Sequence, residues 1–574
     1  MRPMLFARTG LALSHPLDRL ISALRKPSLA GCILVAMTGA CASHAPDAGA
    51  IAEEAERKPT VGLEQQVALV SRTSALTATD RLAACATDPR VIAGLVSQRV
   101  CAGADIFFRE TFDGNGRTCG SCHPVANNFT LDKPFTDALL AANPADPLFV
   151  FQNNPALATL ESSDDFLQKT GVRENLDGFS DLNNRFTVRA VPHIFSLAIT
   201  TRPDPADDRV LLPGEVRPTE ATGWSGDGSP NDGSLRQFLT GAIKQHFPKD
   251  LSRTAGVSFR QPTELELDLT LEYQRSVGRT NELDFTQLNL ADSKANEGRL
   301  AYLDPLRARC NVCHSNGGAN FIDTGLNRNF DTFARTVPDL LSFAGVTTDG
   351  GFGGQSLSTP NIDTLNVGTL GLTGFGDGTF NTPPVIEAVD TMPCFHNNGF
   401  GPDIEGCIAF YASIFLPSPA AQKLDARFGA PVNITGDDIV NIGRFLRVLN
   451  AAFNLDLAKQ RLQAAQTLAN RFHDAPLARS IQLQLLRLAD KEISDALVID
   501  LQNPPQLAPI NPPLHPIAQE RLVSARDEIS AALSAGTWSA RTNRIGNALS
   551  RVLNARDQFG SNINFRMGSG NIMF

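Results

Sequence analysis

The sequence predicts a mainly α-helical protein with two similar domains, long loops and a C-terminal helical extension. Three observations predict this class. Apolar residues recur at helical spacing in several segments, whereas the alternating pattern of strands is rare. One short cysteine–histidine motif occurs twice, each time after a segment of helical pattern. After residue 455 the sequence changes to Leu, Ala, Arg and Gln in helical patterning, interrupted by a proline-rich break at 504–516.

Length and charge limit the classes of function. A chain of 574 residues is too long for one hydrophobic core, so we expect more than one domain. The formal net charge is −9 and no segment is dense in Lys and Arg, so we expect no nucleic-acid partner.

The N-terminus has the pattern of an export signal, which we place at residues 1–42. Arg25 and Lys26 precede an apolar run, and Ala40-Cys41-Ala42 has the small-residue form of a cleavage site. The residues before Cys41 also resemble a lipoprotein motif, so a lipid anchor at Cys41 is an alternative. Residues 43–80, of which the first part is rich in Ala, Pro and charge, follow as a tether. No later segment has eighteen consecutive apolar residues.

Two domains are expected to follow in order. The first, at 81–285, begins with a helical stretch at 102–111, has long polar loops, and ends near a helix at 262–279. The second, at 286–455, opens with a helix at 291–303 and contains a Gly-rich stretch.

The last helix of the second domain is expected to start at Thr435, because Thr is a good N-cap and Asp437 and Asp438 suit the first turn. Residues 456–574 are predicted to be a helical extension without its own chemistry.

Four cysteines outside the leader and the repeated motif fall into two local pairs: Cys85 with Cys101, and Cys394 with Cys407. Such pairs are typical of disulfides in an exported protein. Free buried thiols are the alternative.

The repeated motif is Cys119-Gly120-Ser121-Cys122-His123 and Cys310-Asn311-Val312-Cys313-His314. Covalent haem c needs two thiols for its vinyl groups and a histidine beside the second thiol for the iron. A zinc site would need four ligands, and neither copy has a second thiol pair nearby. We therefore predict two haem c groups, with His123 and His314 as proximal iron ligands, and so two cytochrome c-like haem domains.

Further segments resemble the bacterial dihaem cytochrome c peroxidase and MauG family. The similar segments cover parts of residues 102–452 and exclude the extension. They are Arg189-Ala190-Val191-Pro192, Gly223-Trp224-Ser225-Gly226-Asp227 and Leu235-Arg236-Gln237 in the first domain, and Phe380-Asn381-Thr382-Pro383, Thr391–Gly399 and Ile408–Tyr411 in the second.

The resemblance implies roles for the second haem and for the space between the haems. Trp224 matches a tryptophan that relays electrons between them, although a core tryptophan is the alternative. Tyr411 matches the distal ligand of the second haem, unless it is a packed core residue. His396 would form hydrogen bonds there, or ligate the iron itself. The carbonyls of Thr391 and Pro393 match an interdomain calcium site.

In the classical peroxidases of this family, a displaceable histidine follows the first motif closely. None occurs here between His123 and His193, so the resemblance implies a first iron that is five-coordinate or held by His193 or His246. His246 is also a candidate acid–base residue for peroxide, with a surface histidine as the alternative. Gln237 matches a residue lining the peroxide pocket, but its spacing to Gly241 is one residue longer than in the family.

The resemblance thus implies a periplasmic dihaem oxidoreductase of the MauG type. Hydrogen peroxide would react at the first haem, and a small cytochrome or oxidisable side chains of a partner protein would supply electrons. Two alternatives are a dihaem oxygenase like the rubber-cleaving enzymes and a non-catalytic electron carrier. The carrier needs two firmly six-coordinate irons, and the scarcity of Met and His disfavours it.

Overall fold

The computed structural model describes residues 76–158, 171–175, 186–206, 209, 211, 217–226, 233–336, 348–352, 374–375, 377–416, 418–503 and 508–574. The predicted signal peptide with Cys41, nearly all of the tether and most of the Gly-rich stretch lie outside these residues. Residues 59–574 form one compact unit. Helix accounts for 55% of the residues and strand for 5%, which confirms the mainly α class. None of the described helices has the length and apolarity needed to cross a membrane.

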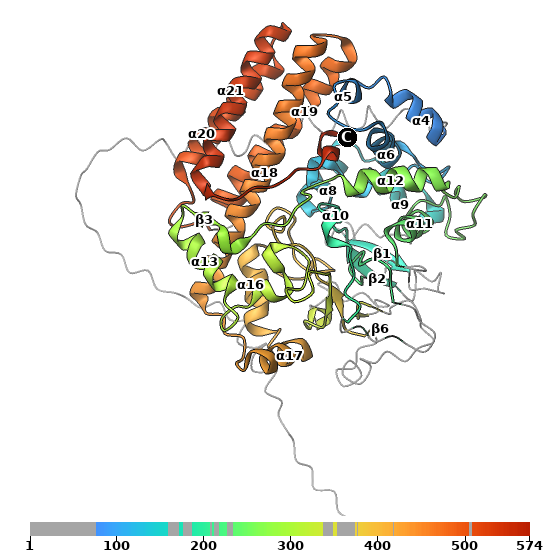
Figure 1. Cartoon of the computed structure of the whole chain (residues 1–574). Coiled ribbons are helices and arrows are strands. Elements are labelled where there is room, and N and C mark those ends of the chain that lie inside the picture. Colours follow the sequence, from blue (N-terminus) through green and yellow to red (C-terminus); the bar gives the residue numbers. More distant parts are fainter. Residues whose placement is uncertain are drawn as a thin grey trace, which may run out of the picture. The chain divides into compact units, whose positions relative to one another are not determined.

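Two helices pack against each other, one before and one after the first cysteine motif in the sequence. They are α6 (Gln98–Arg109) and α12 (Glu264–Arg275), which pack against each other (Figure 1). A Cβ atom on Gly103 of α6 would overlap the backbone of Leu269, so glycine permits the close approach. The Ser97 hydroxyl caps α6, and Thr263 with Glu266 forms a capping box on α12.

A second crossing pair surrounds the second motif. It consists of α13 (Ser293–Leu303) and α18 (Gly436–Phe472). Gly298 of α13 takes the place that Gly103 has in α6, since its Cβ would overlap the backbone of Asn441. The expected N-cap at Thr435 is confirmed, with Asp438 completing a capping box. However, α18 continues to Phe472, so the chain has no break at residue 455, where the sequence suggested a domain boundary.

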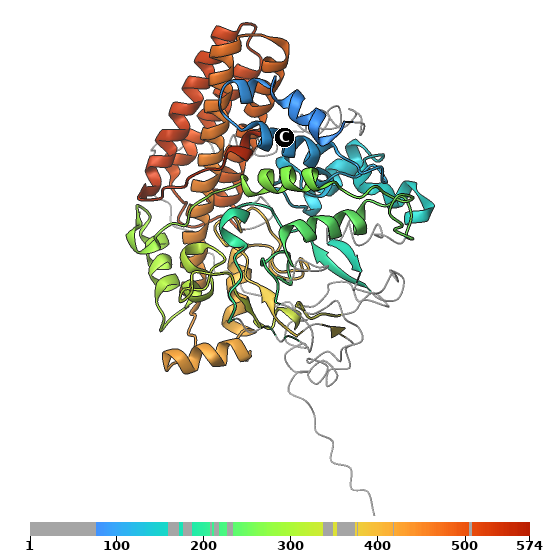
Figure 2. The ribbon, with the colours of Figure 1, turned by 45° about the vertical axis from the view of Figure 1, so that its right-hand side comes forward.

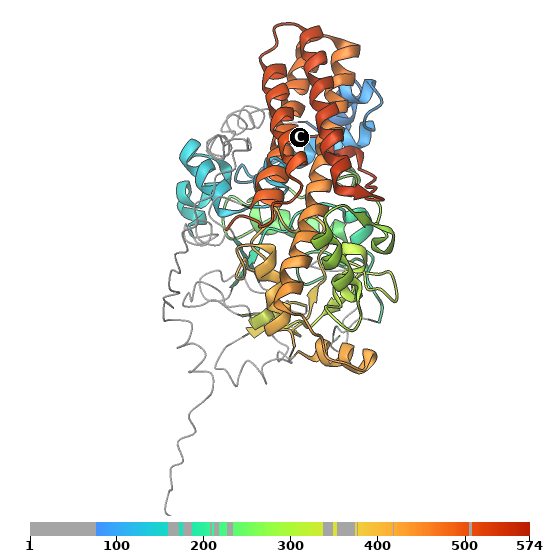
Figure 3. The same ribbon diagram turned by 90° about the vertical axis from the view of Figure 1, so that its left-hand side faces the viewer.

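The C-terminal extension is helical, as expected. α18 packs against α19 (Pro476–Ser494) and α21 (Trp538–Arg556), and α20 (Pro516–Leu533) packs against α21 and α19. Figures 2 and 3 show these four helices running side by side. A π-helix, η9 (Asp495–Gln502), continues directly from α19.

The last fifteen residues return to the two predicted haem domains. β8 (Gly560–Ser561) pairs with β3 (Asn289–Leu290). The side-chain amide of Asn571 accepts a hydrogen bond from Gly278 N at 2.6 Å and donates one to Gly278 O at 3.1 Å. Arg90 donates to Ile572 O at 3.1 Å. These contacts bind the extension to the rest of the unit.

The remaining elements are short. The helices are α4 (Ala78–Cys85), α5 (Pro89–Ile92), α7 (Cys119–Cys122), α8 (Lys133–Ala142), α9 (Val150–Asn153), α10 (Leu197–Thr200), α11 (Leu235–His246), α14 (Cys310–Cys313), α16 (Ile404–Ser413) and α17 (Pro419–Phe428). Two further antiparallel pairs are β1 (Gly171–Asn175) with β2 (Phe186–Ala190) and β4 (Asn329–Phe330) with β7 (Phe380–Asn381). β5 (Thr348–Asp349) and β6 (Gly374–Phe375) pair in parallel.

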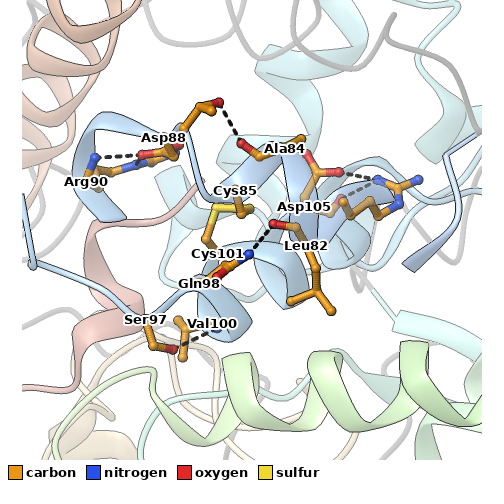
Figure 4. The surroundings of a disulfide bond; sticks show 12 residues. Leu82, Ala84, Cys85, Asp88, Arg90, Ser97, Gln98, Val100, Cys101 and Asp105 are labelled. Carbon is orange, nitrogen blue, oxygen red and sulfur yellow. Dashed lines mark hydrogen bonds and ion pairs between the residues drawn. A yellow bond between two sulfur atoms is a disulfide. The ribbon is translucent and has the colours of Figure 1, made fainter. Parts of the chain in front are cut away.

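Both expected disulfides are present. Cys85–Cys101 joins α4 to α6 (Figure 4), and Cys394–Cys407 joins the 391–400 segment to α16. Beside the first bond, the Gln98 side chain donates to Leu82 O at 2.6 Å and ties the same two helices together. Disulfides of this kind stabilise mainly by restricting the unfolded chain. The four cysteines of the two motifs form no disulfide.

Candidate cofactor and catalytic site

The two cysteine–histidine motifs fold in the same way. Each forms a one-turn helix, α7 or α14, with half-buried thiols at its two ends and the histidine directly after it. His123 has φ −116° and ψ 64°, and His314 has φ −111° and ψ 61°. The local geometry is therefore repeated, although the helix pairs around the motifs have diverged in sequence.

Both motif histidines are held through Nδ1. The Nδ1 of His123 lies 2.8 Å from Phe129 O, and the Nδ1 of His314 lies 2.9 Å from Pro383 O. Because a carbonyl can only accept, Nδ1 carries the proton and Nε2 carries the lone pair. Burial lowers the pKa of both imidazoles to about 4, so both are neutral near pH 7. This is the state of a metal-ligating histidine with a carbonyl partner.

The donor set around each motif fits a covalent haem. In each motif, two thiols on one helical turn lie next to an imidazole whose Nε2 carries a lone pair that can bind a metal. All three tyrosines of the chain also lie near the motifs. Burial, with the charges of the motif cysteines contributing, raises the pKa of Tyr273 near Cys119 and of Tyr302 and Tyr411 near Cys310 and Cys313.

Trp224 lies between the segments that contact the two histidines. Its indole Nε1 donates to Ala190 O at 2.8 Å, and the backbone of Pro192, two residues later, lies beside His123. Its own carbonyl accepts from Asn381 N at 2.9 Å, two residues before the Pro383 carbonyl that holds His314. Trp224 is thus connected to both motifs by short hydrogen-bonded paths.

His396 lies in a polar cluster formed by both predicted domains. Its ring is buried and stacks on Phe380 at 4.3 Å, and its Nε2 is 4.0 Å from Asp349. Arg189 donates two hydrogen bonds to Asp349, at 2.7 and 2.9 Å. Burial raises the pKa of Asp349, but the charge and hydrogen bonds of Arg189, together with smaller contributions from His396 and Gly351, outweigh it and lower that pKa. At 4.0 Å the imidazole lies beyond hydrogen-bond distance of Asp349, so the hydrogen-bonding and ligand roles of His396 both stay predictions.

Tyr411 projects from α16 into an aromatic cluster beside the second motif. Its ring centroid is 5.5 Å from those of Phe410 and Phe415. Burial, and then the charges of Cys313 and Cys310, raise the pKa of its hydroxyl. The phenol is therefore near the second motif, as both the ligand and the packed-core interpretations require.

Gln237 and His246 occupy opposite ends of α11. Gln237 lies in the first turn, where its N–H donates to the Ser234 hydroxyl, and His246 is the last residue. The two residues are nine positions apart, which places their α-carbons about 13 Å apart along the helix axis. His246 lies near the first motif, since it is among the groups that affect the pKa of His123.

His193 is oriented unlike the two motif histidines. Its Nδ1 accepts a hydrogen bond from Phe195 N at 3.3 Å, and burial lowers its pKa. The neutral ring therefore carries its proton on Nε2, which leaves no lone pair there for iron. A five-coordinate first haem and the roles given to His246 stay predictions.

The calcium prediction rests on carbonyl groups alone. Thr391 and Pro393 lie in the segment before Cys394, and the Thr391 hydroxyl donates to Glu387 O at 2.9 Å. Within the described ranges, no group of three or more His, Cys, Asp or Glu side chains is arranged to hold a metal ion.

Comparison with protein-family models, curated proteins and solved structures finds no match to this chain. The family resemblance of the sequence therefore remains a prediction.

Two features of the site had no counterpart in the sequence predictions. Tyr302 donates to His314 O at 2.6 Å, and its place four residues after Gly298 mirrors that of Phe107 after Gly103. The repeated spacing from a glycine to an aromatic residue could have identified Tyr302 from the sequence. The second feature is a buried carboxylate cluster formed by Asp390 with Glu492, Asp495 and Asp500 of the extension. Nothing in the sequence pattern brings these residues together.

Proposed function

We propose that this protein is a periplasmic dihaem c-type oxidoreductase that uses hydrogen peroxide, as the MauG-like resemblance implies. The observation that carries the proposal is the matched geometry of His123 and His314, each with Nδ1 on a carbonyl and two thiols on the preceding turn. Bound haem iron would supply the redox chemistry. The chain's own residues attach the two groups, orient them and separate their environments.

The roles of the surrounding residues differ between the two motifs. His246, at the end of α11, is proposed to move a proton between the oxygens of peroxide at the first haem. Trp224 is proposed to relay electrons, supported by its hydrogen-bonded paths to both motifs. At the second motif, Tyr411 is the proposed distal group and His396 its hydrogen-bonding neighbour.

Export and partners belong to the same proposal. The N-terminal pattern and two disulfides support an oxidising compartment, with the mature chain either free or lipid-anchored at Cys41. The electron donor is proposed to be a small cytochrome or a partner protein. A calcium ion is proposed to bind the carbonyls of Thr391 and Pro393 between the two predicted haem domains.

Low-temperature electron paramagnetic resonance of the resting protein, produced in a host that matures c-type cytochromes, tests the function. We expect one high-spin ferric signal, from an open first haem, and one low-spin signal. The His246→Gln variant is expected to keep both signals and to react with peroxide about 10²-fold more slowly or worse, because acid–base catalysis contributes that much. Two low-spin signals would support an electron carrier instead, and a stable oxygen complex would support an oxygenase.

A further inference from the structure

The loop after the first motif has a backbone that needs external support. Asn128 and Phe129 are consecutive non-glycine residues with φ +54° and +57°. This left-handed conformation is uncommon for such residues and persists where the surrounding structure holds it. Both residues are almost completely buried, at 2% and 1% exposure. The loop matters because the carbonyl of Phe129 accepts the hydrogen bond of His123 Nδ1.

The support comes from the C-terminal extension. The side-chain amide of Asn128 donates to Asp495 Oδ2 at 3.1 Å. Asp495 begins η9, directly after α19, and is ion-paired with Lys491 one turn earlier. α19 also packs against the short 3₁₀ helix η2 (Val125–Asn127) that precedes Asn128. A segment outside the family resemblance therefore contacts the proximal loop of the first predicted haem.

The loop after the second motif also has a left-handed residue, but the contact described for it comes from Phe285 and not from the extension. Asn316, two residues after His314, is also left-handed, with φ +53°. Its side-chain oxygen accepts from Phe285 N at 2.9 Å, and Phe285 lies at the boundary between the two predicted domains. The carbonyl that holds His314 belongs to Pro383, at the end of the β7 segment. The dependence on the extension is specific to the first motif.

We propose that Asp495 is a positioning residue for His123, acting through Asn128 and the Phe129 carbonyl. The inference rests on the proposed function, because it assigns an effect on the first haem. A well-placed acceptor at Nδ1 makes the imidazole a stronger electron donor, and a nearby carboxylate adds negative charge. Both effects stabilise the oxidised iron and hold the reduction potential of the first haem low.

Two variants of the full-length haem protein separate the charge from the hydrogen bond. Asp495→Asn removes the charge but keeps an oxygen that can accept from Asn128. Asn128→Gly keeps the left-handed backbone accessible and removes the amide. Asp490→Asn is the matched control, since Asp490 lies on the same helix and pairs instead with Arg526 of α20, at 3.0 Å.

The measurement is a spectroelectrochemical titration that resolves the two haems, combined with hydrogen-exchange mass spectrometry of the peptide covering 125–131. Asp495→Asn and Asn128→Gly are both expected to raise the first potential by a tenfold change in its reduction equilibrium, about 59 mV for one electron. Exchange in the peptide is expected to accelerate several-fold in Asn128→Gly. The second potential, and the control variant, are expected to stay unchanged.

If both variants fold and leave the first potential and the exchange rates as in the wild type, the proposal is wrong. An equal shift in Asp490→Asn would also overturn it, because the effect would then be general. If the wild type carries fewer than two haems, the proposed function fails instead. The exchange arm, which needs no haem, then still decides whether the hydrogen bond between Asn128 and Asp495 holds the loop.

Discussion

The hydrogen bond at Nδ1 decides which ring nitrogen of each candidate histidine carries the proton. His123 and His314 face carbonyl oxygens through Nδ1, whereas His193 faces an N–H group through the same atom. These contacts distinguish the two proposed proximal ligands from a histidine whose Nε2 carries the proton. The same scale explains Trp224, whose indole and carbonyl each connect to one motif segment.

Trp224→Phe is expected to slow the sharing of oxidising equivalents between the haems by at least tenfold. The variant keeps an aromatic ring but removes the indole and its hydrogen bond to Ala190 O. Stopped-flow spectra after peroxide addition would report both haems, and Trp538→Phe, an exposed tryptophan beside His473, is the control. Equal rates in all three proteins would exclude the relay.

The raised pKa of the buried Asp390 carboxyl group predicts that the stability of the protein depends on pH. Burial, and then the charge of Asp495, raise its pKa from 3.8 to about 8, so the folded state holds a proton that the unfolded state releases at lower pH. The contribution of Asp390 to stability is therefore complete below pH 4 and is lost as pH rises towards 8. Asp390→Asn should flatten the fall in unfolding free energy between pH 5 and about 8, as measured by denaturant titration. An unchanged slope would contradict the assignment.

Local chemistry at the residue scale was predictable from the sequence because it lies within sixteen positions along the chain. The two thiols and the histidine of each motif, and the pairs Cys85–Cys101 and Cys394–Cys407, are of this kind. The contact between Asn128 and Asp495 was not predictable, since no local pattern joins residues so far apart in the chain. The orientation of His193 depends on one loop conformation and was equally hidden.

At the scale of elements, two helix pairs cross at a glycine, and each pair accompanies one motif. Gly103 and Gly298 each contact the backbone of the partner helix. Periodicity and the N-cap residue Thr435 predicted most of these helices. The glycine crossings were not predicted, because helical periodicity does not reveal which face of a helix meets another backbone.

Gly298→Ala is expected to destabilise the protein by about 1–3 kcal/mol, because the added methyl group overlaps the backbone of Asn441. Gly436→Ala is the control. Gly436 is the first residue of α18 and has open space around it, so this variant should be neutral or slightly stabilising. Urea unfolding of the haem-loaded variants measures both values. Similar stability in the two variants would contradict the close crossing.

At the scale of the whole molecule, the extension is an integral part of the compact unit. α18 belongs to the second crossing pair and to the four C-terminal helices, and the final residues bind Gly278 and Arg90. The sequence suggested a separate appendage because the composition changes at 456. Composition reports helix formation and says little about packing partners, so the continuity of α18 across this point was missed.

The central claim is covalent attachment of one haem at each motif. Intact-protein mass spectrometry of chain matured in a host with cytochrome c assembly tests it most directly. We predict a mass increase equal to two haems for the wild type, and to one haem for Cys119→Ala/Cys122→Ala and for Cys310→Ala/Cys313→Ala. A wild-type protein without added mass, or with both haems retained after either pair of substitutions, would contradict the account.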